Sequence, residues 1–193
     1  MFAGIIEAVG IVSQITVVGP GARIEIYAPD FGRDMALGDA VAVDGEKLVI
    51  AQFSRGSFAA DITSDARDNT TLGELAAGQK VNLERGLRIS DRIGGHTLMG
   101  ITDGIGILEQ RSFSGNTFTY TFRVPIQLTD YLIENGPVAI NGISLTVTRL
   151  ADDLVTCLVV PTINEQTTLQ DLSIDAPVNI EVDQVAKYLK KFS

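Results

Sequence analysis

The sequence predicts an all-β protein, with two small antiparallel barrels in tandem and a short C-terminal helix. The first observation is a repeat, because four segments return in the same order 96 or 97 positions later. The hairpin sequence VAVDG at residues 41–45 returns at residues 138–142 as VAING. The other three pairs of segments begin at Gly4 and Gly100, Thr70 and Thr167, and Val81 and Val178. Such a repeat is typical of a duplicated domain.

The second observation is the period-two alternation of polar and apolar residues, which half-buried strands show. Residues 23–27 and 119–123 alternate in this way, and residues 58–62 and 155–160 are further predicted strands. Each copy holds six or so short strands separated by regularly spaced turns. A small closed antiparallel barrel satisfies that pattern.

The third observation concerns the two hairpins. Residues 40–51 and 137–148 are rich in β-branched residues, and each run is interrupted once, by Asp44-Gly45 or by Asn141-Gly142. These dipeptides favour a type I′ turn, whose two central residues both have positive φ. Each run therefore predicts a tight β-hairpin.

The predicted barrels occupy residues 1–93 and 94–183, and the helix occupies residues 184–193. Four apolar residues recur in this tail at helical spacing: Val185, Tyr188, Leu189 and Phe192. Elsewhere helix is scarce, with short turns expected near Met35 and at residues 128–135.

The predicted C-terminal helix at residues 184–193 is too short to be stable alone in water, so it must dock on another surface. The narrow apolar stripe favours a homo-oligomer, and docking on its own second barrel, in a monomer, is the alternative.

Composition narrows the function. The formal net charge of −9 argues against nucleic-acid binding, which needs clustered Lys and Arg. Cys157 is the one cysteine, so no internal disulfide forms and we expect a reducing, cytoplasmic setting. We expect Cys157 itself to be a small core residue. No run is apolar enough for a membrane span, and residues 1–4 lack the features of a signal peptide. One histidine and one cysteine make a metal site improbable.

The two copies differ most usefully in their hairpins. Ser144 and Thr146 stand where the first copy has Lys47 and Val49. Residues two apart on a strand point to one face, so these hydroxyls are able to bind the polar edge of a flat heterocycle. The alternative is ordinary strand residues whose hydroxyls bond to neighbours. Because Lys47 is charged and Val49 has no hydrogen-bonding atom, the corresponding faces of the two barrels cannot bind a ligand with the same chemistry.

Several motifs in chain order resemble riboflavin synthase: MFAGIIE at residues 1–7, VNLER at 81–85, DRIGGH at 91–96, NGISLTV at 141–147, TTL at 167–169 and VNIEVD at 178–183. The resemblance covers the whole chain. It implies two six-stranded barrels of the riboflavin-synthase type, each binding a pteridine or isoalloxazine ring in a shallow pocket. It also implies dismutation of two molecules of 6,7-dimethyl-8-ribityllumazine, at a site shared between subunits of a trimer.

The departures from that family fall mainly in the first copy. In the first hairpin, Lys47 stands where the family usually has Cys, and Val49 stands where it has Thr. Further along the chain, Met99 replaces a Ser, Ile101 replaces a His and Asn135 replaces a Lys. Dismutation needs proton transfer and a nucleophile, which such residues usually supply. Lumazine proteins and yellow fluorescent proteins have lost the same first-barrel residues and hold their ligand without reaction. In those proteins the first barrel is usually the binding one, whereas here the second keeps the intact block.

Candidate binding residues follow from this alignment. In the second barrel they are Ser144, Thr146, Thr162, Ile163 and Thr167. In the first barrel they are Lys47, Val49, Thr63 and Thr70, with Ile101 and Thr102 from the segment that follows it. No catalytic residue is assigned. Three residues are weak catalytic candidates. Lys47 could act as a base if burial lowered its pKa. His96 is alternatively a loop residue, and Asp183 is alternatively a helix cap.

We therefore expect a non-catalytic binding protein for riboflavin, FMN or 6,7-dimethyl-8-ribityllumazine, with a fluorescent, antenna-type role as one form. The absence of Trp is compatible with fluorescence, because an indole stacked on a flavin quenches it. The first alternative is an active riboflavin synthase with a divergent first barrel. The second is a structural paralogue without a ligand, against which Ser144, Thr146 and Thr167 argue.

Overall fold

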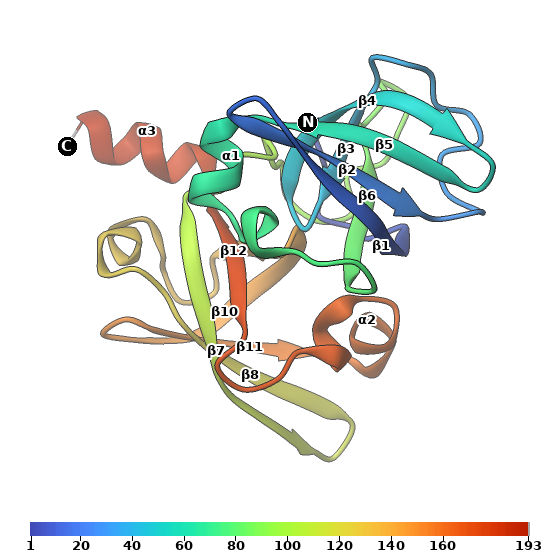
Figure 1. Ribbon diagram of the computed structural model, residues 1–193. Coiled ribbons are helices and arrows are strands. Elements are labelled where there is room, and N and C mark those ends of the chain that lie inside the picture. Colours follow the sequence, from blue (N-terminus) through green and yellow to red (C-terminus); the bar gives the residue numbers. More distant parts are fainter. Residues whose placement is uncertain (193) are drawn as a thin grey trace.

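A computed structural model describes residues 1–192, which form two closed six-stranded antiparallel barrels (Figure 1). The strands of the first barrel are β1 (Ala8–Val18), β2 (Gly21–Tyr27), β3 (Ala40–Val43), β4 (Glu46–Ser54), β5 (Ser57–Ile62) and β6 (Lys80–Arg85). Those of the second are β7 (Gly104–Ser114), β8 (Thr117–Arg123), β9 (Pro137–Ile140), β10 (Ile143–Ala151), β11 (Leu154–Val159) and β12 (Pro177–Val182). The predicted fold class is confirmed.

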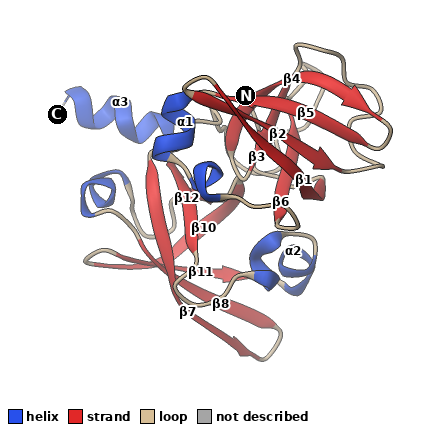
Figure 2. Cartoon of the chain, viewed as in Figure 1, coloured by secondary structure: helices blue, strands red, loops and turns tan. Residues whose placement is uncertain are grey.

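Helices are short, as Figure 2 shows. They are α1 (Ser64–Asn69), α2 (Pro161–Glu165) and α3 (Gln184–Phe192), with 3-10 turns η1 (Thr71–Glu74), η2 (Ile126–Tyr131) and η3 (Thr168–Asp171). The helical turn expected near Met35 is a non-helical loop, and the one expected at 128–135 begins earlier, as η2. The last residue of the predicted tail helix, Ser193, lies outside the described residues. No helix within residues 1–192 is long and apolar enough to cross a membrane.

Both hairpins have the predicted turn. Asp44 and Gly45 have φ of +45° and +85°, and Asn141 and Gly142 have +46° and +77°. Positive φ at both central residues is the mark of type I′. Inside each barrel the alternating apolar residues close a separate core. Cys157 is fully buried in the second core, as its strand pattern predicted.

The segment that precedes each barrel lies against the other barrel. The Ser144 amide donates to the Gly4 carbonyl over 2.9 Å, and in the other copy the Lys47 amide donates to the Gly100 carbonyl over 2.8 Å. Each arm is also held by its own barrel, because the carboxylate of Glu84 accepts from the amides of residues 3–4 and that of Glu181 accepts from residues 99–101. These two segments, the exchanged arms, therefore bridge the two barrels about a pseudo-two-fold axis.

A buried amide network joins the barrels on that axis. The Asn82 side chain donates to the Asn141 carbonyl over 3.0 Å and accepts from the Thr168 amide over 2.8 Å. The Asn179 side chain makes the equivalent bonds to the Asp44 carbonyl, 2.9 Å, and the Thr71 amide, 2.8 Å. Both amide side chains are out of solvent. The relative placement of the barrels is therefore fixed by directional bonds.

The tail helix α3 is held to the second barrel by two ion pairs. Lys187 pairs with Asp103 at 2.7 Å, and Lys190 pairs with Asp130 at 2.9 Å. Its apolar residues remain 58–82% exposed. In Figure 1 the helix extends away from the barrels. The apolar face is thus not buried within this chain.

Candidate functional site

The outer wall of the second barrel carries the predicted pair of hydroxyls. On β10, Leu145 and Val147 point into the core, while Ser144 is half-buried and Thr146 is exposed on the outer face. Across the ladder, Val147 pairs with Cys157, so Thr146 lies beside Leu158 of β11. The shared face that the sequence predicted is present.

Ser144 is fixed by backbone that packs on both sides of it. A Cβ placed on Gly4 would lie 2.5 Å from the Ser144 Cβ, and one placed on Gly95 would lie 2.8 Å from it. Only glycine fits at these two positions. The Ser144 hydroxyl is 2.7 Å from Nδ1 of His96, which follows Gly95. The spacing of 48 residues between these partners gives no signal in the sequence.

His96 is a neutral imidazole at pH 7. Burial lowers its pKa below the usual range, and the negative charge of Asp183 opposes that shift. The second ring nitrogen, Nε2, is buried without a protein partner among the described residues. Asp183 itself caps α3, because its carboxylate accepts from the Val185 amide over 2.6 Å. The helix-cap interpretation of Asp183 is thus observed, and its catalytic role stays a prediction.

Apolar side chains surround the hydroxyl pair. Leu158 is 52% exposed, Val160 just beyond β11 is 54% exposed, and Ile5 of the exchanged arm is 45% exposed. Exposed apolar residues beside a few fixed polar groups are typical of a surface that binds a flat organic ring. The wall can stack a heterocycle and hydrogen-bond its polar edge.

The remaining second-barrel candidates lie on the turns that follow β11. Thr162 is exposed on α2, and Ile163 is half-buried against the core. Thr167 is 2% exposed; its hydroxyl donates to the Ile163 carbonyl over 2.8 Å and accepts from the Leu169 amide over 3.4 Å. In this conformation, therefore, the Thr167 hydroxyl supports the turn.

The first-barrel candidates form a different wall. Lys47 is exposed, and Val49 and Ile101 are 50% and 52% exposed. The Thr102 amide donates to the Glu46 carboxylate over 2.9 Å, and the Thr102 hydroxyl is buried without a protein partner among the described residues. This wall offers a cation and aliphatic surface where the second barrel offers two hydroxyls.

The threonines of the first barrel serve its local structure. Thr63 caps α1 by accepting from the Ala66 amide over 3.1 Å, and Thr70 donates to the Ala66 carbonyl and accepts from the Leu72 amide. Thr70 is buried, whereas Thr63 is exposed beside the end of β5. Of the two, only Thr63 presents its side chain at the surface.

Glu46 lies beside the first-barrel candidates, bonded to Thr102, and was not among the predicted residues. It stands where the second copy has Ile143, which is buried in the core. Burial raises the pKa of Glu46, and the bond from Thr102 opposes that rise. The signal available in the sequence was the change from a charged residue in the first copy to an isoleucine in the second.

Neither wall carries a poised thiol. Cys157 has no exposed surface, and burial raises the pKa of its thiol to about 12. Lys47 is exposed to solvent, which removes the burial that its role as a base would need. Within residues 1–192, no three His, Cys, Asp or Glu side chains are grouped so as to hold a metal ion.

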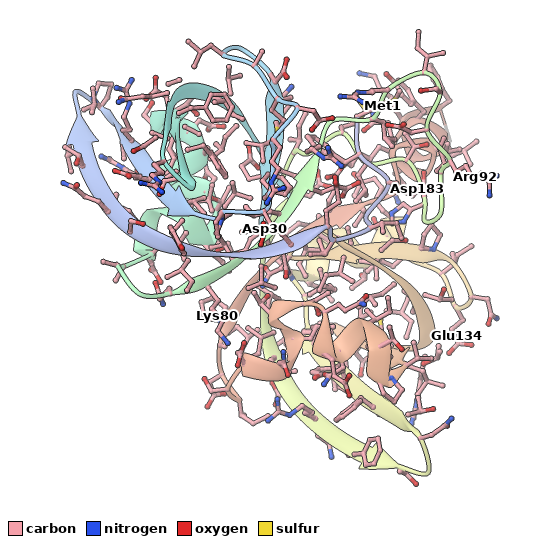
Figure 3. All side chains as sticks on the ribbon, turned by 90° about the vertical axis from the view of Figure 1, so that its right-hand side faces the viewer. Met1, Asp30, Lys80, Arg92, Glu134 and Asp183 are labelled. Carbon is pink, nitrogen blue, oxygen red and sulfur yellow. The ribbon has the colours of Figure 1, made fainter. Side chains whose placement is uncertain are left out.

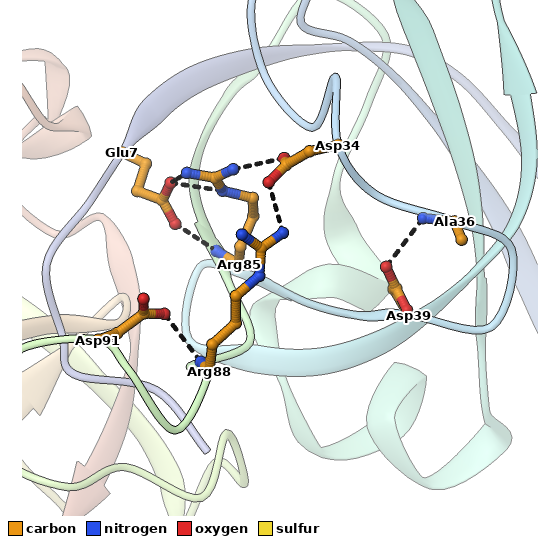
Figure 4. A network of polar contacts seen from close by, with 7 residues as sticks. All are labelled: Glu7, Asp34, Ala36, Asp39, Arg85, Arg88 and Asp91. Atoms are coloured by element: carbon orange, nitrogen blue, oxygen red, sulfur yellow. Dashed lines mark hydrogen bonds and ion pairs between the residues drawn. The ribbon is translucent and has the colours of Figure 1, made fainter.

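A cavity of about 740 Å³ lies beside these walls and is lined by charged side chains. Figure 4 shows its polar network, in which the Arg85 guanidinium pairs with Glu7 and Asp34 and the Arg88 guanidinium pairs with Asp34. The backbone amide of Arg88 donates to the Asp91 carboxylate over 2.8 Å. Ile5 and Gly94 line both this cavity and the approach to Ser144. In this cavity Arg85 and Arg88 are paired with carboxylates, so its lining is more charged than the apolar wall beside Ser144.

Comparison with known proteins agrees with this geometry. Residues 3–86 and 99–183 match the lumazine binding domain family. The riboflavin synthases of Actinobacillus pleuropneumoniae and Bacillus subtilis (strain 168) are 38% and 32% identical over 192 residues, which is 100% of this chain and 89% of each relative. Crystal structures of LumP complexed with riboflavin and with 6,7-dimethyl-8-(1'-D-ribityl) lumazine have TM-scores of 0.88 and 0.86, at 25% identity over 95% of this chain and 100% of theirs. The resemblance to the riboflavin synthase superfamily is thus confirmed, and the chain belongs to the lumazine binding domain family.

Proposed function

We propose that this chain is a non-catalytic binding protein for riboflavin, FMN or 6,7-dimethyl-8-ribityllumazine, with the second barrel as the better site. LumP is crystallised with each of these three ligands. On the second barrel, Ser144 and Thr146 bond the polar edge of the ring, and Leu158, Val160 and Ile5 contact its faces. A fluorescent role follows if the bound ring is shielded from water.

The observation that carries the proposal is the difference between the two walls. Dismutation requires two rings held by complementary sites and a nucleophile or base acting between them. Lys47 and Val49 replace the hydroxyl wall in the first barrel, and the chain's one thiol, Cys157, is buried with its pKa raised to about 12. A protein with these residues keeps one wall that can bind a ring. It lacks a matching second wall and an accessible thiol that could act as nucleophile.

Riboflavin synthase activity is the second candidate. It is favoured by the Ser144–His96 hydrogen bond of 2.7 Å, with the negative charge of Asp183 partly opposing the lowering of the His96 pKa by burial. It is also favoured by identities of 32–38% to riboflavin synthases over the whole chain. These residues give the second barrel a hydroxyl and a neutral imidazole in contact.

Two measurements separate the candidates. The absorption spectrum of the purified protein, and its titration with each ligand, report binding: a flavin gives a yellow protein and a lumazine a near-ultraviolet band. Incubation with 6,7-dimethyl-8-ribityllumazine, followed by riboflavin absorbance, reports dismutation. We expect tight binding with absent or very slow turnover. Turnover comparable to that of an ordinary synthase assigns the second candidate, and no binding of any of the three ligands rejects both.

A further inference from the structure

The first exchanged arm passes through a glycine that is bonded to both barrels. The Gly4 amide donates to the Glu84 carboxylate over 3.1 Å, and the Gly4 carbonyl accepts from the Ser144 amide over 2.9 Å. Glu84 belongs to β6 of the first barrel and Ser144 to β10 of the second. In Figure 3, Met1, where this arm begins, lies on the same side of the view as Asp183, which follows the last strand of the second barrel. A chain of hydrogen bonds therefore leads from a first-barrel carboxylate to the ring wall of the second barrel.

The second arm repeats this arrangement. The Gly100 amide donates to the Glu181 carboxylate over 3.1 Å, and the Gly100 carbonyl accepts from the Lys47 amide over 2.8 Å. The two glycines have φ of +73° and +72°, in the left-handed region that glycine adopts without strain. Each carboxylate is thus linked through its own arm to the outer wall of the other barrel, and the two links serve as controls for each other.

The first arm packs directly against Ser144. A Cβ placed on Gly4 would lie 2.8 Å from the Ser144 backbone nitrogen. One placed on Gly95 would lie 2.1 Å from the Ala3 carbonyl oxygen and 2.9 Å from the Ser144 hydroxyl oxygen. Contacts this close leave no space for one segment to move alone, because packed interiors transmit small displacements. A shift of the arm therefore moves the Ser144 side chain with it.

Glu84 directs its charge at this arm. On β6, Val81 and Leu83 lie in the first core, so Glu84 points out of the barrel, where the arm covers it and leaves it 4% exposed. Its carboxylate also accepts from the Ala3 amide over 2.6 Å, and no cation pairs with it within residues 1–192. Burial raises the pKa of Glu84 to about 7, and the bonds from the arm amides oppose that rise. An ionised acceptor makes stronger bonds to amides than a neutral one does.

We propose that Glu84 is a positioning residue for the ring site of the second barrel, acting through Gly4 on Ser144 and Ile5. Ser144 offers its hydroxyl to the polar edge of the ring, and Ile5, the next residue of the arm after Gly4, contacts a face of the ring. When Glu84 loses an acceptor, the arm is held less firmly and both contacts weaken, although neither contacting residue is changed. This inference rests on the proposed function and adds that the first barrel controls the affinity of the second.

Riboflavin titration of the whole protein tests this role at pH 8, where Glu84 is mostly ionised. Glu84→Gln keeps the length of the side chain but offers one acceptor oxygen to two amides, so we expect about three- to tenfold weaker binding. Glu181→Gln is the matched control, because it makes the same change within the barrel that carries the ring site, while its arm leads to Lys47. It should leave the affinity unchanged. Equal losses in the two variants, or a loss in Glu181→Gln alone, would overturn the assignment.

A double-mutant cycle with Ile5→Ala shows whether Glu84 acts through the arm. In the Ile5→Ala protein, Glu84→Gln should weaken binding much less than it does in the parent, because both changes remove the same contact. Full additivity would reject action through Ile5. If Glu84→Gln does not fold, Glu84→Asp carries the same predictions, because it keeps the charge and shortens the side chain by one methylene.

Hydrogen exchange in the ligand-free protein tests the same chain of bonds without a ring. By mass spectrometry, peptides containing Ser144 should exchange faster in Glu84→Gln, and those containing Lys47 should exchange faster in Glu181→Gln. A parent that binds no ring, with this crossed pattern present, rejects the proposed function and supports the link between the barrels. A parent that binds riboflavin, with Ser144 exchange unchanged in Glu84→Gln, rejects the positioning role alone.

Discussion

At the scale of single residues, the two copies keep one backbone scaffold while their side chains differ, both in the core and on the outer walls. Ser144 and Lys47 share a backbone setting, since each donates its amide to the carbonyl of an exchanged arm. The side chains above that shared backbone differ in charge and in hydrogen-bonding capacity. Ligand preference therefore depends on side chains that leave the barrel intact.

The first prediction concerns the hydroxyl of Thr146. Thr146→Val removes one uncharged hydrogen bond to the ring, worth about 1 kcal/mol, and should weaken ligand binding about fivefold. Val49→Thr is the matched control, because it adds a hydroxyl at the equivalent place in the first barrel and should leave second-barrel affinity unchanged. Fluorescence titration with riboflavin measures both. A silent Thr146→Val, together with loss of binding on substitution of Lys47, Thr63 or Thr70, would place the ligand on the first barrel.

The second prediction concerns the buried carboxyl of Asp44. In the folded protein its pKa is about 7, against an ordinary value of 3.8, so the folded chain keeps a proton that the unfolded chain releases. The free energy of unfolding therefore falls as pH rises from about 4 to about 7 and then levels off. Asp44→Asn removes this dependence and should be more stable than the parent at pH 8, by up to about 4 kcal/mol.

Urea unfolding at pH 5 and at pH 8 measures that difference. At pH 5 the two proteins should differ much less, because Asp44 is then largely protonated in the folded chain. Glu84, whose pKa burial also raises to about 7, contributes the same trend in both proteins and cancels in the comparison. An equal stability difference at both pH values would contradict a raised pKa for Asp44.

At the scale of elements, the local sequence pattern determines where strands and hairpins form. Contacts between residues far apart in sequence determine how these elements pack against one another. The Asp-Gly and Asn-Gly turns and the alternating strands were predictable because each depends on neighbouring residues. The exchanged arms, the Asn82 network and the His96–Ser144 bond join residues that are far apart in sequence, so no local pattern indicates them. Thr70 and Thr167 show the converse, since their hydroxyls were predicted for the ligand and are bonded to backbone.

The third prediction tests how the elements are joined. Asn82→Ala removes an amide with no exposed surface and leaves the Asn141 carbonyl and the Thr168 amide unpaired. We expect a loss of about 2–4 kcal/mol in the free energy of unfolding, because two buried groups lose their partners. Lys80→Ala is the control; it removes an exposed barrel-to-barrel ion pair and should cost at most about 1 kcal/mol. Similar losses in both variants would show that the network contributes little.

At the scale of the whole molecule, the apolar face of α3 is exposed and has no partner within residues 1–192. The ion pairs to Asp103 and Asp130 orient the helix, and they leave its apolar side outward. The sequence predicted the amphipathic pattern because helical spacing is local. It did not predict which side docks, because that depends on charges contributed by the second barrel.

The fourth prediction is therefore an oligomer that depends on α3. Light scattering on the full chain should give a multiple of 20.6 kDa, and a chain ending at Asp183 should be monomeric. Leu189→Lys, which places a charge on the 68%-exposed apolar side, should dissociate the assembly without unfolding the barrels. Lys191→Ala is the control on the same helix. Monomeric mass for the full chain would reject the oligomer and would weigh against synthase activity.

The exchange of arms has an evolutionary consequence. Two identical chains that trade N-terminal arms about a two-fold axis make a symmetric dimer, and every mutation in such a dimer appears twice. Joining two copies of the gene end to end preserves the same contacts and allows each half to mutate independently of the other. Asp44 opposite Asn141, and Lys47 opposite Ser144, are substitutions that a dimer of identical subunits cannot separate. A covalent link between the halves allows each outer wall to carry its own side chains without changing the other.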